Sequence, residues 1–150
     1  MRDGPRYGAL VIRLALGVIF VAHGAQKLLG WWGGSGFAGT VAQFTRMGMP
    51  APLAVLVIVA EFFGGLGVLF GALTRLAAFG IACVMVGGIF TVHLRNGFFI
   101  NWSNEPGRGH GIEANLAYLA MALALCMTGA GALSIDELVF RGSGPRGASS

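Results

Sequence analysis

The sequence predicts an all-α protein: a bundle of four transmembrane helices with a short interfacial helix in the first outer loop. Apolar residues make up 55% of the 150 residues and charged residues only 11%, whereas a soluble domain carries about 25% charge. Four apolar stretches are each near the length needed to cross a bilayer, about 20 residues. Glycine, with 26 residues, is frequent enough for helices that pack closely in lipid.

The same composition excludes several classes of protein. A globule of this size cannot bury so much apolar surface and still coat itself with polar groups, so a soluble enzyme is disfavoured. The net charge of +4 comes from Lys and Arg scattered singly along the chain, which gives no basic stripe for a nucleic acid. Cys83 and Cys126 form no disulfide framework and no metal or redox motif. We therefore expect no metal site and no covalently bound cofactor.

The first predicted span covers residues 7–30 and ends before two tryptophans. Arg13 interrupts its apolar part and no small-residue cleavage site follows, so we expect this helix to stay in the protein rather than act as a secretory signal. The second span covers 53–72. It follows Pro50-Ala51-Pro52, and proline is tolerated where a helix begins.

The third span covers 76–94 and begins after a tight connection at Thr74-Arg75. The fourth covers 112–130 and contains no charge after Glu113. No linker between the spans is long enough to separate domains. We therefore predict a single membrane domain over residues 1–141, followed by a disordered, Gly/Ser/Pro-rich cytoplasmic tail over 142–150.

Four spans place both termini on one side of the membrane. Positive residues are slightly more numerous on that side, which favours cytoplasmic termini. They are Arg2, Arg6, Arg75, Arg141 and Arg146 on the side of the termini, and Lys27, Arg46, Arg95 and Arg108 on the other. Trp31, Trp32 and Trp102 would form an aromatic belt at the outer interface. We expect a multi-pass protein of the bacterial inner membrane.

Two short helices are predicted outside the spans. Phe37, Val41 and Phe44 recur at helical spacing, which predicts a helix over residues 35–47 lying on the outer interface. Ser134 and Glu137 have the spacing of a capping box, which predicts a brief cytoplasmic helix ending near Phe140.

The ionisable residues inside the spans are the candidate functional residues. A charge at the bilayer centre is unfavourable by roughly 2.5–3.5 kcal/mol, so such residues should face the bundle interior and pair. At the rise of a helix, most of them lie in the outer half of the membrane and one lies deeper. The outer group is His23, Lys27, Glu61, His93 and Glu113; the deeper residue is Arg13.

Glu61 is the strongest of these candidates. It lies mid-span and is too short to reach the interface, so it needs a partner, and both Lys27 and Arg13 could supply the charge. Gly64, Gly65 and Gly67 would let another helix approach closely beside it.

Each of the other ionisable residues also has a simpler structural explanation. Lys27 and Arg13 could extend to the interfaces. The two histidines could hold helices together as neutral polar groups, and Glu113 could stabilise the start of its helix.

At these residues the sequence resembles the DoxX-like family of small bacterial four-helix membrane proteins. The resemblance covers roughly residues 7–140 and rests on Arg13 to Lys27, Glu61-Phe-Phe-Gly-Gly, Gly71-Ala-Leu-Thr-Arg75, His93, Glu113-Ala-Asn115-Leu and Gly129 to Asp136. It implies a helical bundle in the bacterial inner membrane and a link to quinone or sulfur redox chemistry. It also adds Asn115 to the candidate site.

The leading functional hypothesis is a membrane component, or subunit, of a quinone-linked oxidoreductase system, in which the polar residues bind a small ligand or relay protons. Its partners would be the lipid bilayer, quinone, other redox subunits and further copies of the chain. Glu61, His23 and Lys27 are the predicted catalytic residues. Arg13, His93, Glu113 and Asn115 are the predicted ligand-binding residues.

Three alternatives remain open from the sequence. The chain could be a non-catalytic assembly or binding subunit, in which the buried charges only set helix packing. It could bind haem b through His23 and His93, although these residues differ in depth by several ångström on the rise of a helix. It could also be a transporter or channel, because buried ionisable groups mark ion paths too.

Overall fold

The computed structural model describes residues 4–141 and confirms the all-α fold class. No strand occurs within that range. The α-helices are α1 Gly4–Leu29, α2 Gly36–Arg46, α3 Ala51–Phe70, α4 Thr74–Gly88, α5 Glu113–Thr128 and α6 Ile135–Arg141. A 3-10 turn (η1) follows α1 at Trp31–Gly33, and α4 continues through a π-helical turn (η2, Ile89–His93) and a 3-10 turn (η3, Leu94–Asn96). The tail predicted to be disordered, 142–150, lies outside the described residues.

Three helices of the described chain are long and apolar enough to cross a membrane: α1, α3, and α4 with its continuation to Asn96. The fourth, α5, is apolar but has only 16 residues, about 24 Å at the rise of a helix. It ends two residues before the predicted limit because Gly129 turns the backbone to a φ of 79°. After this break the chain resumes as α6.

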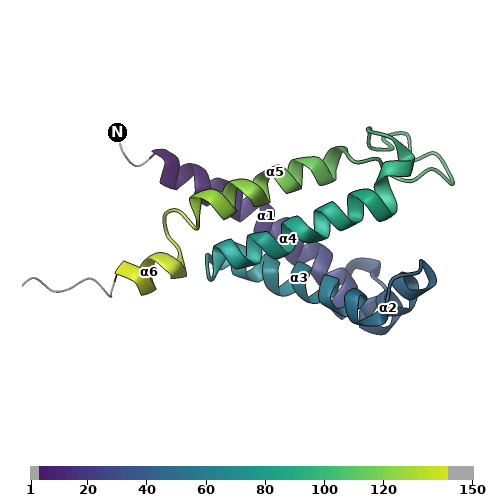
Figure 1. Ribbon diagram of the computed structural model, residues 1–150, viewed down its shortest axis with the longest axis horizontal. Coiled ribbons are helices and arrows are strands. Elements are labelled where there is room, and N and C mark those ends of the chain that lie inside the picture. Colours follow the sequence, from purple (N-terminus) through teal and green to yellow (C-terminus); the bar gives the residue numbers. More distant parts are fainter. Residues whose placement is uncertain (1–3, 142–150) are drawn as a thin grey trace, which may run out of the picture.

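The helices form one elongated bundle with two distinct ends (Figure 1). The N-terminal part of α1 and helix α6 lie at one end, here named the α6 end. Helix α2 and the loop 97–112 lie at the other, the α2 end. Helix α1 packs along α3, α3 packs on α4, and α4 packs on α5.

Glycines bring α1 and α3 into direct backbone contact. A Cβ added to Gly24 would lie 2.5 Å from the Cα of Phe62, and one added to Gly65 would lie 2.7 Å from the backbone nitrogen of Val21. Only residues without a side chain allow this approach. This contact, here named the α1–α3 seam, lies one turn from Lys27 on α1 and beside Glu61 on α3. It therefore determines how close these two residues come.

Side chains at the α6 end hold the helix termini. The Asp136 carboxylate accepts hydrogen bonds from the backbone nitrogens of Leu73 (2.7 Å) and Thr74 (2.9 Å), at the start of α4. Ser134 Oγ accepts one from the backbone nitrogen of Glu137 (3.2 Å), which is half of the predicted capping box. Such side chains satisfy backbone donors that a helix leaves unpaired.

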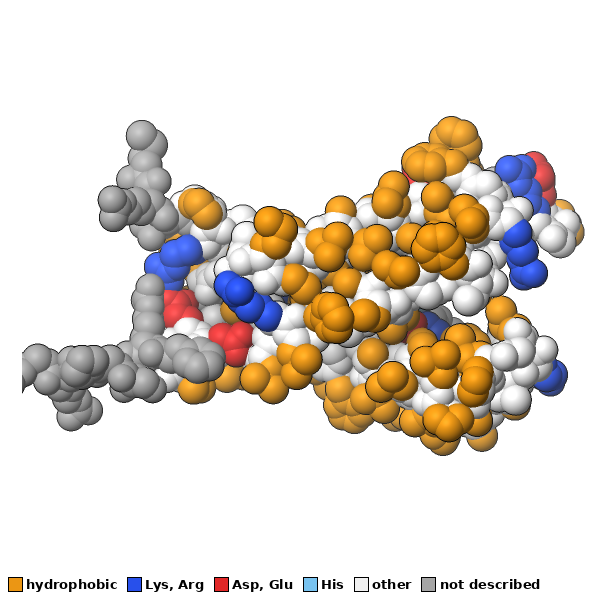
Figure 2. All heavy atoms as spheres, in the orientation of Figure 1, with side chains coloured by type: hydrophobic (Ala, Val, Ile, Leu, Met, Phe, Trp, Pro, Cys, Tyr) orange, Lys and Arg blue, Asp and Glu red, His pale blue; other side chains and the backbone are white. Residues whose placement is uncertain are grey.

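The exterior of the bundle suits a lipid environment. Large apolar side chains point outward from the spanning helices, among them Val18 (58% exposed), Leu56 (60%) and Phe90 (71%). Figure 2 shows hydrophobic side chains over the middle of the visible face and most charged side chains near the two ends. A water-soluble surface does not have this distribution.

Candidate functional site

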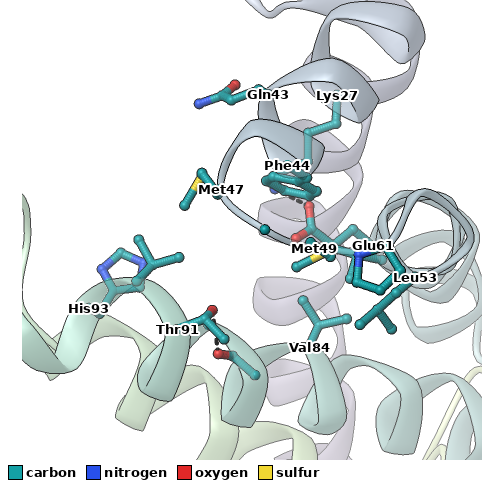
Figure 3. A pocket seen from close by; sticks show the side chains of 16 residues that line it. Lys27, Gln43, Phe44, Met47, Met49, Leu53, Glu61, Val84, Thr91 and His93 are labelled. Atoms are coloured by element: carbon teal, nitrogen blue, oxygen red, sulfur yellow. Dashed lines mark hydrogen bonds and ion pairs between the residues drawn. The ribbon is translucent and has the colours of Figure 1, made fainter.

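A pocket of about 490 Å³ lies at the α2 end, between α2 and α3 on one side and the end of α4 on the other. Figure 3 shows side chains from these elements around it. Most of the lining is apolar, and a few polar side chains converge on it. The lining residues are Lys27, Gln43, Phe44, Met47, Gly48, Met49, Pro50, Leu53, Val57, Glu61, Val84, Gly87, Gly88, Thr91, Val92 and His93.

Lys27 and Glu61 form an ion pair at the wall of this pocket. The Lys27 ammonium donates a hydrogen bond to Glu61 Oε2. The Glu61 side chain is only 6% exposed and that of Lys27 is 26% exposed. A carboxylate removed from water requires such a partner. The ammonium has three N–H donors, and a single carboxylate oxygen takes one of them.

His93 lines the same pocket from the π-helical turn at the end of α4. Its Nδ1 lies 2.8 Å from the backbone oxygen of His110. Because a carbonyl oxygen only accepts, Nδ1 carries a proton and its N–H donates a hydrogen bond to the His110 backbone oxygen. In the neutral ring Nε2 is then the acceptor. π-Helical turns are rare and occur frequently at functional sites.

The pocket opens on the side of the bundle. Leu53 of α3 and Gly87 and Thr91 of the α4 region line it and are themselves exposed. Figure 2 shows the visible face hollowed between the α2 region and the end of α4. Leu53 belongs to α3, and Gly87 and Thr91 belong to α4 and its continuation, so the opening lies between two of the helices long enough to span a membrane.

The structure places Arg13 away from Glu61. Arg13 is only 2% exposed, and its Nη2 donates to the backbone oxygens of Leu133 (2.8 Å) and Ala132 (3.3 Å) at the α6 end. His23 lies one turn before Lys27 on α1 but is exposed and does not line the pocket.

Glu113 and Asn115 do not line the pocket. Glu113 Oε2 accepts a hydrogen bond from the backbone nitrogen of Ile100 (3.1 Å) and so anchors the loop 97–112 to α5. Asn115 is buried between α5 and α4, where its Nδ2 lies 3.6 Å from the Met85 sulfur. Glu113 thus holds the loop that contains His110, and Asn115 contacts the helix that leads to His93.

Sequence reasoning did not single out two parts of this site. The first is the wall formed by Phe44, Met47 and Met49, although the periodic spacing of Phe44 in the predicted helix was a signal for a buried contact. The second is His110, whose backbone oxygen orients His93. No sequence pattern indicates a role that a backbone oxygen performs.

Comparison with known proteins gives a consistent picture. The family model described as DoxX matches residues 8–94. The chain is 31% identical to "Putative oxidoreductase CatD" of Bacillus subtilis, over 95% of this chain and 94% of that protein. It is 35% identical to "Inner membrane protein YqjF" of Escherichia coli, over 88% of this chain and 92% of that protein.

A third relative is "Uncharacterized membrane protein Rv3486" of Mycobacterium tuberculosis, 32% identical over 90% of this chain and 82% of that protein. No solved structure matches the chain. The family model covers more than half of the chain, and the relatives align over most of their length. The chain therefore belongs to the DoxX family of membrane proteins.

Proposed function

We propose that this protein is a membrane component of an oxidoreductase system and that its pocket at the α2 end binds a quinone-class ligand. The observation that carries the proposal is the Lys27–Glu61 ion pair at the wall of an apolar pocket that opens between spanning helices. The name of the Bacillus subtilis relative, "Putative oxidoreductase CatD", supports the same class of function.

The pocket suits such a ligand in size and chemistry. Its volume of about 490 Å³ lies within the range usual for small-molecule sites. A quinone has a planar apolar ring with oxygen atoms at opposite ends, and it dissolves in the bilayer. The apolar lining would hold the ring, the lateral opening would admit it from lipid, and the Lys27 ammonium would donate to one oxygen.

A bound quinone would supply the redox chemistry, since it exchanges two electrons and two protons between its oxidised and reduced forms. The electrons would pass to or from a partner redox subunit. Lys27 would hold a proton at Nζ beside the ligand oxygen. Glu61, which accepts a hydrogen bond from the same ammonium, would keep the ammonium in place and exchange protons with the site. The apolar side chains around them would keep water out.

The test is recovery of quinone with the purified protein. Wild type would be isolated in lipid nanodiscs from quinone-containing membranes, then extracted and analysed by chromatography and mass spectrometry. Gly87→Leu is the decisive variant, because Gly87 lines the pocket and a Cβ there meets no atom within 4 Å. Gly8→Leu is the matched control, since Gly8 is an exposed α1 residue with equally open space around it.

We expect wild type and Gly8→Leu to retain quinone in a constant ratio to protein, and Gly87→Leu to lose most of it relative to wild type. Equal retention in all three proteins would place any bound quinone outside the pocket. Recovery of wild type without quinone would contradict the proposal and favour the alternative of a non-catalytic assembly subunit.

A further inference from the structure

The pocket carries hydrogen-bonding groups at two separate places. One is the Lys27–Glu61 pair, contributed by α1 and α3. The other is His93 at the end of α4. Figure 3 shows His93 across the pocket from Lys27 and Glu61, with apolar side chains such as Val84 and Met47 around the space between them. A ligand that satisfies both places must carry polar atoms at opposite ends of an apolar body.

The hydrogen bond of His93 determines what kind of atom it can recognise. Nδ1 donates to the His110 backbone oxygen, so the neutral ring presents Nε2 as an acceptor. The Glu61 carboxylate at the other place is also an acceptor. The Lys27 ammonium beside it still has N–H donors to offer, so this place can pair with either a hydroxyl or a carbonyl oxygen. The choice is therefore made at His93, where a hydroxyl group can donate to Nε2 and a carbonyl group cannot.

The loop 97–112 holds the His110 backbone oxygen in position. Asn101 is buried, and its side-chain nitrogen donates to the backbone oxygens of Arg108 (2.9 Å) and Glu105 (3.2 Å). Its backbone nitrogen donates to His110 Nδ1 (3.2 Å). Asn96 Nδ2 donates to the same His110 backbone oxygen as His93 (3.1 Å). The tautomer of His93 is thus determined by the backbone oxygen of His110, which the hydrogen bonds of the loop hold in place.

We propose that the pocket selects the reduced, para-dihydroxy form of its ligand, a quinol, over the oxidised quinone. One hydroxyl donates to His93 Nε2. The other donates to the Glu61 carboxylate while its oxygen accepts from Lys27. The inference rests on the proposed function, because it specifies the oxidation state of the ligand in that same pocket. It makes Glu61 and His93 proton acceptors at the two ends of the ring.

The test compares binding of tetramethyl-para-hydroquinone, tetramethyl-para-benzoquinone and the monomethyl ether of the hydroquinone. Ring methylation matters because Cys83 is exposed, and thiols attack unsubstituted quinone carbons. Binding to the full chain in nanodiscs would be measured by isothermal titration calorimetry, without oxygen, at a pH near 8 where free imidazole is neutral. The proteins are wild type, His93→Leu and His93→Gln.

For wild type we expect the hydroquinone to bind at least tenfold more tightly than the quinone, with the monomethyl ether between them. In His93→Leu the hydroquinone should lose about tenfold in affinity, and the quinone should change less than twofold. The glutamine side chain carries an acceptor oxygen, so His93→Gln should recover part of the lost hydroquinone affinity. This partial recovery separates recognition from a packing role of the ring.

A second measurement addresses the tautomer directly. The three histidines of wild type would be labelled with 15N and observed by NMR. The signals that disappear in His93→Gln belong to His93, and their chemical shifts should show the proton on Nδ1. In Asn101→Ala the same ring should shift toward the other tautomer, and hydroquinone affinity should fall.

The outcomes distinguish this inference from the proposed function. Equal or tighter binding of the quinone than of the hydroquinone by wild type, or a His93→Leu effect that is the same for both forms, would overturn the inference and leave the proposed function in place. A wild-type protein that binds none of the three probes would overturn both.

Discussion

Arg13 Nη2 donates a 2.8 Å hydrogen bond to the backbone oxygen of Leu133, 120 residues further along the chain. Leu133 lies in the break between α5 and α6, where its φ of 52° takes the backbone out of the helical conformation. A broken helix leaves carbonyl groups without intrahelical donors, which is tolerated at membrane depth only where protein supplies partners. Arg13 supplies them here, so its buried charge serves the backbone of the break.

Replacing Arg13 with methionine should therefore destabilise the fold. The variant keeps an unbranched apolar stem but leaves the Leu133 and Ala132 oxygens unpaired, for an expected loss of about 2–4 kcal/mol. Thermal unfolding in detergent, followed by circular dichroism, would measure it. Arg75→Met is the control, because Arg75 is exposed at the same end of the bundle. If Arg13→Met melts at the same temperature as wild type, the break does not depend on this side chain.

The Lys27–Glu61 pair should behave as one unit in a double-mutant cycle. Lys27→Met and Glu61→Gln each leave one partner of a largely buried pair alone, and each should lose about 3 kcal/mol. The double variant leaves neither charge behind and should lose clearly less than the sum of the two, by 1 kcal/mol or more. Unfolding free energies of the four proteins provide the comparison. Strictly additive losses would mean that the two side chains do not interact in the membrane.

The α1–α3 seam should be sensitive to a single methyl group. In Gly24→Ala the new Cβ would lie 2.5 Å from a backbone atom of Phe62, so the helices must separate and Lys27 must move away from Glu61. We expect a loss of about 1–3 kcal/mol. The retained quinone should fall as well. Gly8→Ala, with nothing within 4 Å, should change stability by less than about 1 kcal/mol. Similar stability of both variants would contradict the close approach.

Asp136 should make stability depend on pH at the α6 end. Partial burial raises its pKa, but hydrogen bonds from Thr74 and Leu73 and the nearby charge of Arg13 outweigh this, so the pKa lies below the ordinary value of 3.8. Because the pKa of Asp136 is lower in the folded state than in the unfolded state, the carboxylate stabilises the fold fully at pH values well above 3.8. This stabilisation is lost as the pH falls below 3.8 and through the folded-state pKa.

The measurement is the melting temperature between pH 7 and pH 3. Asp136→Asn should be less stable than wild type at pH 7 by about 1 kcal/mol and should show a flatter decline with acid. Glu105→Gln is the control, because Glu105 forms an exposed pair with Arg108 in a loop, and such pairs contribute little. Parallel curves for wild type and Asp136→Asn would remove the proposed role of the carboxylate.

The fold class could be predicted from the sequence because hydrocarbon leaves the backbone few choices. Long apolar runs must pair their own N–H and C=O groups, so they become helices. This reasoning correctly predicts the helices around residues 7–30, 53–72 and 76–94. It overestimates the length of the helix over 112–130, because Gly129 takes a positive φ there and the carbonyls of the break find a donor in Arg13, which belongs to a distant segment of the chain.

The sequence by itself determined that a carboxyl group at position 61 needs a basic neighbour, because its charge is unfavourable in an apolar medium. It left Lys27 and Arg13 as equivalent candidates. Only the tertiary structure decided between them. The α1–α3 seam brings Lys27 against Glu61, while Arg13 donates its hydrogen bond to the Leu133 oxygen. The pocket itself and the orientation of His93 were decided in the same way, because both arise where α2, α4 and a backbone oxygen of a distant loop come together in space.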